Sequence, residues 1–432
     1  MTTADLEIYE SKAYKRSRSA YRWECTFEYF VALMVSDAFL ANLLTSMGIS
    51  DALAGVISSF ITLAFLFQIF SIFVVQRITN TKVFVTIFHT ASQIFFMLLY
   101  LVPFLPWPKE AKHGVAIACI LLAYFGNYLV TSIIYNWGNS HVDPHKRGSY
   151  SAGKEMLSLI TGMVVTLGAG YLMDYFEAQG QMEVGFVFTA IAIFIFTICD
   201  FVCLMLIKNR IIPKETRNIV PLREVLHNTL GNRDFINVII LNVLWDIGRY
   251  TTIGFLGTYR IKELAFTVGT VQLINIVANL ARFSVSKPFG RYTDKHSFVK
   301  GAELGFIIIA TAFAVHVFAT PETRWLTAVY AILFNVGIAG VAQNFFNMTY
   351  SYVDSKYYVE GSAIKNSIGG IFGFGASLAA SQLLEHIQSN GNTLFGIPVY
   401  GQQVLSLISL IFMLAAILFA HFVIGKQKVM IQ

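Results

Sequence analysis

Two opposite charges lie in the middle of an apolar stretch of this sequence. The run Leu241–Phe255 reads LNVLWDIGRYTTIGF, with Asp246 and Arg249 three residues apart. A charged side chain at the centre of a lipid bilayer costs a few kcal/mol even on lenient insertion scales. Such side chains therefore face other helices or water, and they are the first candidates for chemistry in this chain.

Polar residues share one helical face in two consecutive apolar segments. Residues three, four or seven apart lie on the same side of an α-helix. A stripe of this length cannot face lipid, so it lines a water-accessible cavity, which is the interpretation we favour, or forms a network of hydrogen bonds between helices. The stripes consist of Asn242, Asp246 and Arg249, with Trp245 beside them, and of Gln272, Asn275, Asn279 and Arg282.

The carboxylates are candidate sites for a coupling proton or for a substrate. At 1.5 Å per residue, Asp246 lies roughly 16 Å from the end of its segment, near the middle of a bilayer core about 30 Å thick. Asp37 is predicted at a similar depth in the first segment. A carboxylate that exchanges its cationic partner for a proton can couple transport to a gradient. The spacing equally allows a static Asp246–Arg249 ion pair, and the sequence leaves both alternatives open.

Further amides and one tyrosine are candidates for contacts with a hydroxyl-rich solute. Aromatic rings stack on the C–H faces of sugars, and amides form hydrogen bonds with their hydroxyl groups. Ordinary packing between helices is the alternative for each. These candidates are Gln68, Asn127, Tyr135, Asn335, Gln343 and Asn347.

The composition defines the class of protein that must position these residues. Hydrophobic residues make up 56% of the chain and charged residues only 13%, against about 25% charged residues in a soluble protein. Apolar runs of about 20 residues predict an all-α membrane protein with twelve transmembrane helices. We place the helices at 26–47, 54–76, 82–105, 114–137, 152–174, 184–207, 235–258, 268–289, 299–319, 325–348, 362–384 and 401–425.

The basic residues orient the predicted helices. Of the 31 Lys and Arg residues, five fall on the side of the membrane opposite the N-terminal tail and two lie within spans, which leaves 24 on the side of the tail. The positive-inside rule then places both termini in the cytoplasm. We expect the protein in the inner or plasma membrane. This bias also accounts for the net charge of +6 without a nucleic-acid partner.

An internal repeat divides the chain into two halves. Asp37 and Gly48 recur as Asp246 and Gly257 at a constant offset, in the first helix of each half. Such an offset indicates a duplication. We expect a short surface helix around Leu222–Leu230. The predicted domains are a cytoplasmic tail at 1–25, a six-helix bundle at 26–207, a cytoplasmic loop at 208–234, a second six-helix bundle at 235–425 and a cytoplasmic tail at 426–432.

Two motifs indicate a family. The run Gly290–Lys295, GRYTDK, resembles the Gly-x-x-x-Asp-(Arg/Lys) signature of the loop between helices 8 and 9 in the major facilitator superfamily. The run Asp143–Tyr150, DPHKRGSY, is similar to a Pro-x-x-x-Arg-Gly-x-Tyr turn of bacterial sugar-transporter-like members. The resemblance covers essentially the whole chain, although Asn80 stands where the family has Asp. It implies a cytoplasmic gating motif at Arg77, Asn80, Arg147, Gly290, Arg291, Asp294 and Lys295.

The resemblance also implies a function. Two pseudo-symmetric six-helix bundles would work as a secondary transporter by alternating access. We expect proton-coupled import of a small hydrophilic solute, with a sugar or glycoside as the preferred interpretation. An exporter of drugs or metabolites and a non-transporting solute sensor are the alternatives.

The sequence carries no motif that points to an enzyme. It contains no phosphate-binding loop, nucleophile elbow or zinc-type His/Cys cluster, so we expect neither enzymatic activity nor a cofactor or metal. The expected partners are the solute, protons and the lipid bilayer, with no nucleic acid, and we expect a monomer.

Overall fold

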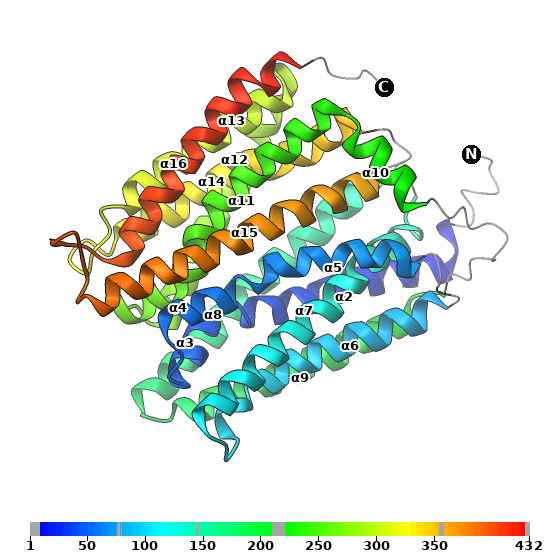
Figure 1. Ribbon diagram of the computed structural model, residues 1–432. Coiled ribbons are helices and arrows are strands. Elements are labelled where there is room, and N and C mark those ends of the chain that lie inside the picture. The colour runs from blue at the N-terminus through cyan, green and yellow to red at the C-terminus, as the bar shows by residue number, and fades with distance from the viewer. Residues whose placement is uncertain are drawn as a thin grey trace. The chain divides into compact units, whose positions relative to one another are not determined.

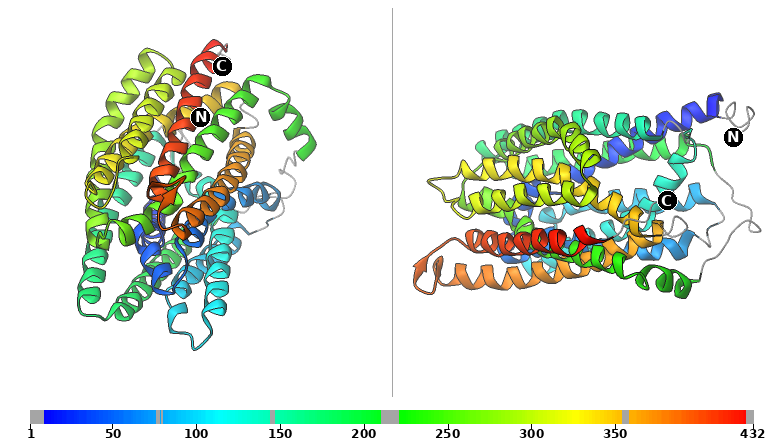
Figure 2. Two further views of the ribbon diagram at one scale, coloured as in Figure 1. Left: turned by 60° about the vertical axis from the view of Figure 1, so that its left-hand side comes forward. Right: turned by 90° about the horizontal axis from the view of Figure 1, so that it is seen from above.

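The structure is a computed structural model that describes residues 9–75, 78, 80–143, 147–209, 221–353 and 358–427. Nearly all of this part of the chain is helical (Figures 1 and 2). One short antiparallel hairpin joins β1 (Thr393–Leu394) to β2 (Ile397–Pro398). The all-α class predicted from composition is therefore confirmed.

Each predicted span corresponds to a helix or to a pair of helices. The predicted surface helix is present as α10 (Leu222–Leu230). The first half contains α2 (Lys12–Met34), α3 (Asp37–Ser46), α4 (Asp51–Ser58), α5 (Phe60–Val75), α6 (Thr81–Leu99), α7 (Lys109–Asn139), α8 (Arg147–Ala178) and α9 (Met182–Leu206). The second half contains α11 (Arg233–Thr258), α12 (Val268–Lys295), α13 (Phe298–His316), α14 (Leu326–Tyr352), α15 (Tyr358–Ser389) and α16 (Gly401–Phe422), with a π-turn η4 (Tyr259–Glu263) after α11.

Most of these helices suit a bilayer. Ten helices in the described part are long and apolar enough to cross a membrane, and the bent pair α2 and α3 would make an eleventh. α11 also has sufficient length, 26 residues, but it is not among the ten and carries Asp246 and Arg249. These properties define a multi-pass integral membrane protein.

Contacts divide the chain into two compact units. One contains the described residues of Met1–Gly48 and Phe70–Ile219, and the other those of Ile49–Ile69 and Val220–Gln432. The segment Ile49–Ile69, with α4 and the first part of α5, therefore groups with the second unit. In sequence order it belongs to the predicted bundle 26–207, so most of the second predicted span, 54–76, groups with the second unit.

Glycines explain this grouping. A Cβ atom on Gly254 of α11 would lie 2.6 Å from the backbone oxygen of Gly55 on α4. A Cβ atom on Gly370 of α15 would lie 2.3 Å from the backbone oxygen of Thr62 on α5. Small residues let transmembrane helices approach to backbone contact. The α4–α5 segment therefore packs closely against both α11 and α15.

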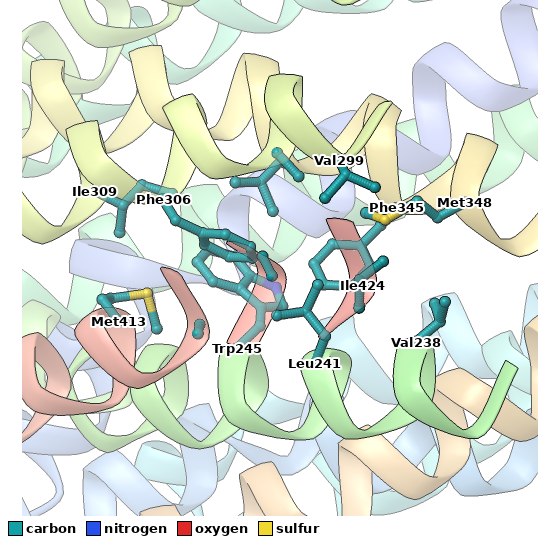
Figure 3. Packing of buried hydrophobic residues seen from close by; sticks show 14 of the residues in the cluster. Val238, Leu241, Trp245, Val299, Phe306, Ile309, Phe345, Met348, Met413 and Ile424 are labelled. Carbon is teal, nitrogen blue, oxygen red and sulfur yellow. The ribbon is translucent and has the colours of Figure 1, made fainter. Parts of the chain in front are cut away.

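The core of the second unit is aromatic and aliphatic. Here α11, α13, α14 and α16 pack against one another. Trp245 of α11 points into a buried cluster (Figure 3) and lies 5.8 Å from the ring centroid of Phe306 and 6.3 Å from that of Phe334. This core fixes how α11 is turned about its own axis. Asp246 follows Trp245 directly in the sequence and lies on a different side of the helix.

Candidate functional site

Asp246 is buried against the backbone of α15. Its side chain is 7% exposed, and its Oδ2 atom accepts a hydrogen bond of 2.8 Å from Nδ2 of Asn242, one turn earlier on α11. A Cβ atom on Gly369 of α15 would lie 2.1 Å from each of these two atoms. Because Gly369 has no side chain, α15 can cover the carboxylate and exclude lipid.

Lys365 is a site residue that sequence reasoning misses. It is 5% exposed and lies four residues before Gly369 on α15, so the two share a helical face. Its charge acts on the Asp246 carboxylate, and its Nζ atom lies 5.2 Å from the ring centroid of Phe345. A lysine three residues inside the predicted span 362–384 suggests only a helix end. The repeat of Lys365, Gly369 and Gly373 at intervals of four is the signal that could have revealed it.

Arg249 does not form the ion pair with Asp246 that its spacing allows. No salt bridge joins them in the described residues; the guanidinium carbon lies 4.8 Å from the ring centroid of Tyr250 and 5.7 Å from that of Trp245. Its Nε atom is buried and makes no hydrogen bond with the described residues. The site therefore combines one carboxylate with two cations, of which one rests on aromatic rings.

The second predicted polar stripe lies on α12, which packs mainly against helices other than α11. Gln272 is buried, while Asn275, Asn279 and Arg282 are half-buried. The main neighbours of α12 are α14 and α13. The structure therefore does not bring this stripe against α11, and its role stays a prediction.

The candidates in the first unit occupy two helices. Asp37 begins α3 with a φ of 46°, a left-handed backbone conformation that is uncommon for a residue other than glycine. It lies at the break between α2 and α3, where the pair bends by 44°. On α7, Asn127 is half-buried, and the Tyr135 ring is 49% exposed and lies 4.8 Å from Nζ of Lys154.

The remaining polar candidates are less constrained. Gln68 on α5 and Asn347 on α14 are half-buried. Nδ2 of Asn335 donates a hydrogen bond of 3.0 Å to the backbone oxygen of Ala331, which is typical of a packing residue. The side chain of Gln343 lies outside the described part of the structure.

The gating motif after the eighth span is helical rather than a loop. The predicted span ends at 289, but α12 continues through Gly290 to Lys295, and Arg291, Asp294 and Lys295 are exposed. Asn80 accepts a hydrogen bond from the backbone nitrogen of Val83 at 3.3 Å, so it caps the N-terminus of α6. Arg77 and the side chain of Arg147 lie outside the described residues.

A polar network ties α4 to the far ends of α11 and α15. Lys262 of η4 forms an ion pair with Asp51, the first residue of α4, and Nε2 of Gln388 donates a hydrogen bond of 3.0 Å to Oδ2 of Asp51. Burial and the nearby Asp51 carboxylate raise the pKa of Glu263 above its usual range. Asp51, Glu263 and Gln388 all line a small pocket at this end of the unit.

We expect Asp51→Asn to lower the stability of the protein only slightly. The Lys262 side chain is 32% exposed, and an ion pair so close to water contributes about 1 kcal/mol or less. Thermal unfolding of the purified protein would measure the effect, which should shrink in high salt. The double variant Asp51→Asn, Lys262→Gln should be no less stable than either single variant, and a further loss would contradict a simple pair.

The structure holds polar and charged groups between long apolar helices. The sequence matches the family model described as Major Facilitator Superfamily over residues 23–380. The chain therefore belongs to the major facilitator superfamily. No curated protein was found with significant similarity to the sequence.

Solved transporters share the fold at low sequence identity. The nucleoside transporter NupG is 12% identical, with a TM-score of 0.66, and the match covers 97% of this chain and 100% of that one. An auto-inhibited peptide transporter of the POT family is 12% identical, with a TM-score of 0.71 and 98% of each chain covered. A bacterial metal transporter is 13% identical, with a TM-score of 0.60 and coverage of 96% and 99%. These likenesses support the fold alone, and the three solute classes differ.

Proposed function

We propose that the protein is a secondary active transporter that imports a small hydrophilic solute together with protons by alternating access. A sugar or glycoside is the proposed class of solute. The energy for accumulation would come from the proton gradient.

The buried carboxylate of Asp246 carries the coupling part of this proposal. It faces α15 with Lys365 on that helix and Arg249 on its own helix, so two cations can alternate as its electrostatic partners. A small movement of α15 along α11 would change the distance from Lys365 to the carboxylate. A proton would then replace the lost cation, which links protonation to helix movement.

Asn127 and Tyr135 on α7 support the solute class. The Tyr135 ring is 49% exposed, and Oδ1 of Asn127 is buried and accepts no hydrogen bond from the described residues. An exposed ring and, about two turns away on the same helix, an amide oxygen that needs a donor suit a molecule with C–H faces and hydroxyl groups. Lys154 above the ring would restrict the orientation of such a solute.

Uptake by proteoliposomes under an imposed proton gradient tests the proposal. A panel of labelled sugars and glycosides would be the probes, and we expect Asp37→Asn and Asp246→Asn to reduce proton-driven accumulation at least tenfold. Solute exchange without a gradient should persist, because substrate binding does not require the proton. Glu385→Gln, which removes an exposed acid from α15, is the matched control. Wild-type accumulation in both Asp variants would show that neither residue couples protons to transport.

A further inference from the structure

Three ionisable side chains from three helices meet in the interior of the first unit. Glu24 lies on α2, His89 on α6 and Asp200 on α9, and their side chains are 0%, 0% and 1% exposed. One ligand-type atom from each lies within 4.8 Å of the others. The Asp246 site belongs to the second unit, so this cluster is a separate feature of the chain.

The distances in the cluster are close to those of a metal site. Nε2 of His89 lies 3.1 Å from Oδ2 of Asp200 and 3.9 Å from Oε1 of Glu24. Two ligands at tetrahedral positions, each about 2.1 Å from a zinc ion, are roughly 3.4 Å apart. The three side chains are therefore close enough together to coordinate one ion after small movements.

Several polar atoms around the cluster are buried without a hydrogen-bond partner among the described residues. They include Oε1 of Glu24, Oδ1 of Asp200, Nδ1 of His89 and Oε1 of Gln93. Buried polar atoms are normally paired, because an unpaired one destabilises the folded state. Three of these atoms are acceptor oxygens, and their concentration in one buried place supports a cation that completes the site.

The charges of the cluster lead to the same conclusion. While both carboxylates are ionised, the two acids and the imidazole keep a net negative charge even when the imidazole is protonated. The cation of Lys154 is separated from Glu24 by Cys25, whose Sγ atom lies 3.2 Å from Nζ of Lys154 and donates to Oε2 of Glu24 at 3.2 Å. A divalent cation bound to a neutral imidazole would neutralise both acids, as buried charge requires.

We propose that Glu24, His89 and Asp200 bind a divalent first-row transition-metal cation such as Zn²⁺. One imidazole and two carboxylates suit such ions. The Nε2 atom of Gln93 lies 3.5 Å from Nε2 of His89, and the amide, if turned over, would supply an oxygen as the fourth ligand. The bound ion joins α2, α6 and α9, so it acts as a structural clamp within the first unit.

Metal retention by the purified full-length protein tests this proposal. The protein would be treated with a chelator, loaded with Zn²⁺, desalted and analysed for metal and for its melting temperature. We expect about one Zn²⁺ per chain and a higher melting temperature after loading. His89→Gln should lose at least nine tenths of the retained metal and the thermal shift. His316→Gln, at a fully buried histidine that pairs with Ser406 in the second unit, should keep both.

Cobalt provides a second measurement in case His89→Gln fails to fold. The visible absorption of Co²⁺ should appear with the wild-type protein and disappear with Asp200→Asn, a variant of nearly the same shape. Retention of Zn²⁺ by both variants at the wild-type level would overturn the proposal. Failure of the folded wild-type protein to retain Zn²⁺ would also overturn the proposal. The three buried side chains would then be stabilised by protonation and by ion pairs among themselves.

Discussion

Asp246→Asn should destabilise the protein by about 3 kcal/mol, because it leaves a buried cation without its counter-charge. Lys365 is 5% exposed and its interaction with Asp246 crosses the α11–α15 contact. Lys365→Met should cost less, since Arg249 still offsets the remaining carboxylate. Thermal unfolding of the purified variants measures both effects, and we expect the Asp246 variant to melt at the lower temperature.

The double variant Asp246→Asn, Lys365→Met separates stability from transport. Removing both charges should restore much of the stability lost in Asp246→Asn, since no unpaired ion remains at the contact. Proton-driven accumulation should stay low, because the carboxylate that we propose to titrate is absent. Strictly additive losses in the double variant would show that the two residues do not interact. Restored accumulation would show that Asp246 has an electrostatic role in folding and no role in coupling.

Gly370→Ala should have a comparably large effect on the contact between α5 and α15. The added Cβ atom would lie 2.3 Å from the backbone oxygen of Thr62, and a backbone atom cannot move aside as a side chain can. The helices would have to separate, which we expect to cost about 3 kcal/mol. Thermal unfolding again measures the loss, and transport should fall with it if this contact forms during the cycle.

Gly375→Ala is the matched control on the same helix. No atom lies within 4 Å of the position that its Cβ would take, and the residue is exposed. Alanine is a better helix former than glycine by up to about 1 kcal/mol. This variant should therefore be as stable as the wild type or slightly more stable. Equal losses in both variants would mean that α15 is sensitive to any added side chain and that close approach to α5 is not the cause.

Both sets of variants test contacts made by α15. α15 contributes Lys365 and Gly369 to the carboxylate site and Gly370 to the contact with α5. A movement of α15 would therefore change the charge environment of Asp246 and the α5 contact together. In the proposed transport cycle, this connection would couple protonation to a change of conformation.

Much of the fold follows from the sequence by itself. Runs of about 20 apolar residues predict membrane helices because backbone groups in lipid must satisfy one another within a segment. All twelve predicted spans correspond to helices, and the helix predicted around Leu222–Leu230 is present with those bounds. Errors occur at helix ends. α12 continues through GRYTDK to Lys295, because exposed polar residues are compatible with a helix that emerges from the bilayer.

The polar sites were only partly predictable. Asp246 and Arg249 stand out because charged residues in an apolar run are costly, and Asn242 stands out because it shares their helical face. Both features can be recognised from neighbouring residues in the sequence. The partners of these residues on other helices do not stand out, since nothing in a linear pattern states which helix faces lie together. Lys365 and Gly369 become part of the site only when α15 packs against α11. Arg249 likewise turns from the carboxylate to the rings of Tyr250 and Trp245, which the spacing alone could not decide.

The cluster in the first unit shows the same division. Glu24 lies just outside the predicted span 26–47, and His89 and Asp200 lie in two other predicted spans, 82–105 and 184–207. By itself, the sequence determined the class of protein, its helices and its two most conspicuous charges, because burial in lipid constrains each segment separately. Only the tertiary structure decided which side chains meet, because helix packing is set by close contacts between residues far apart in the chain.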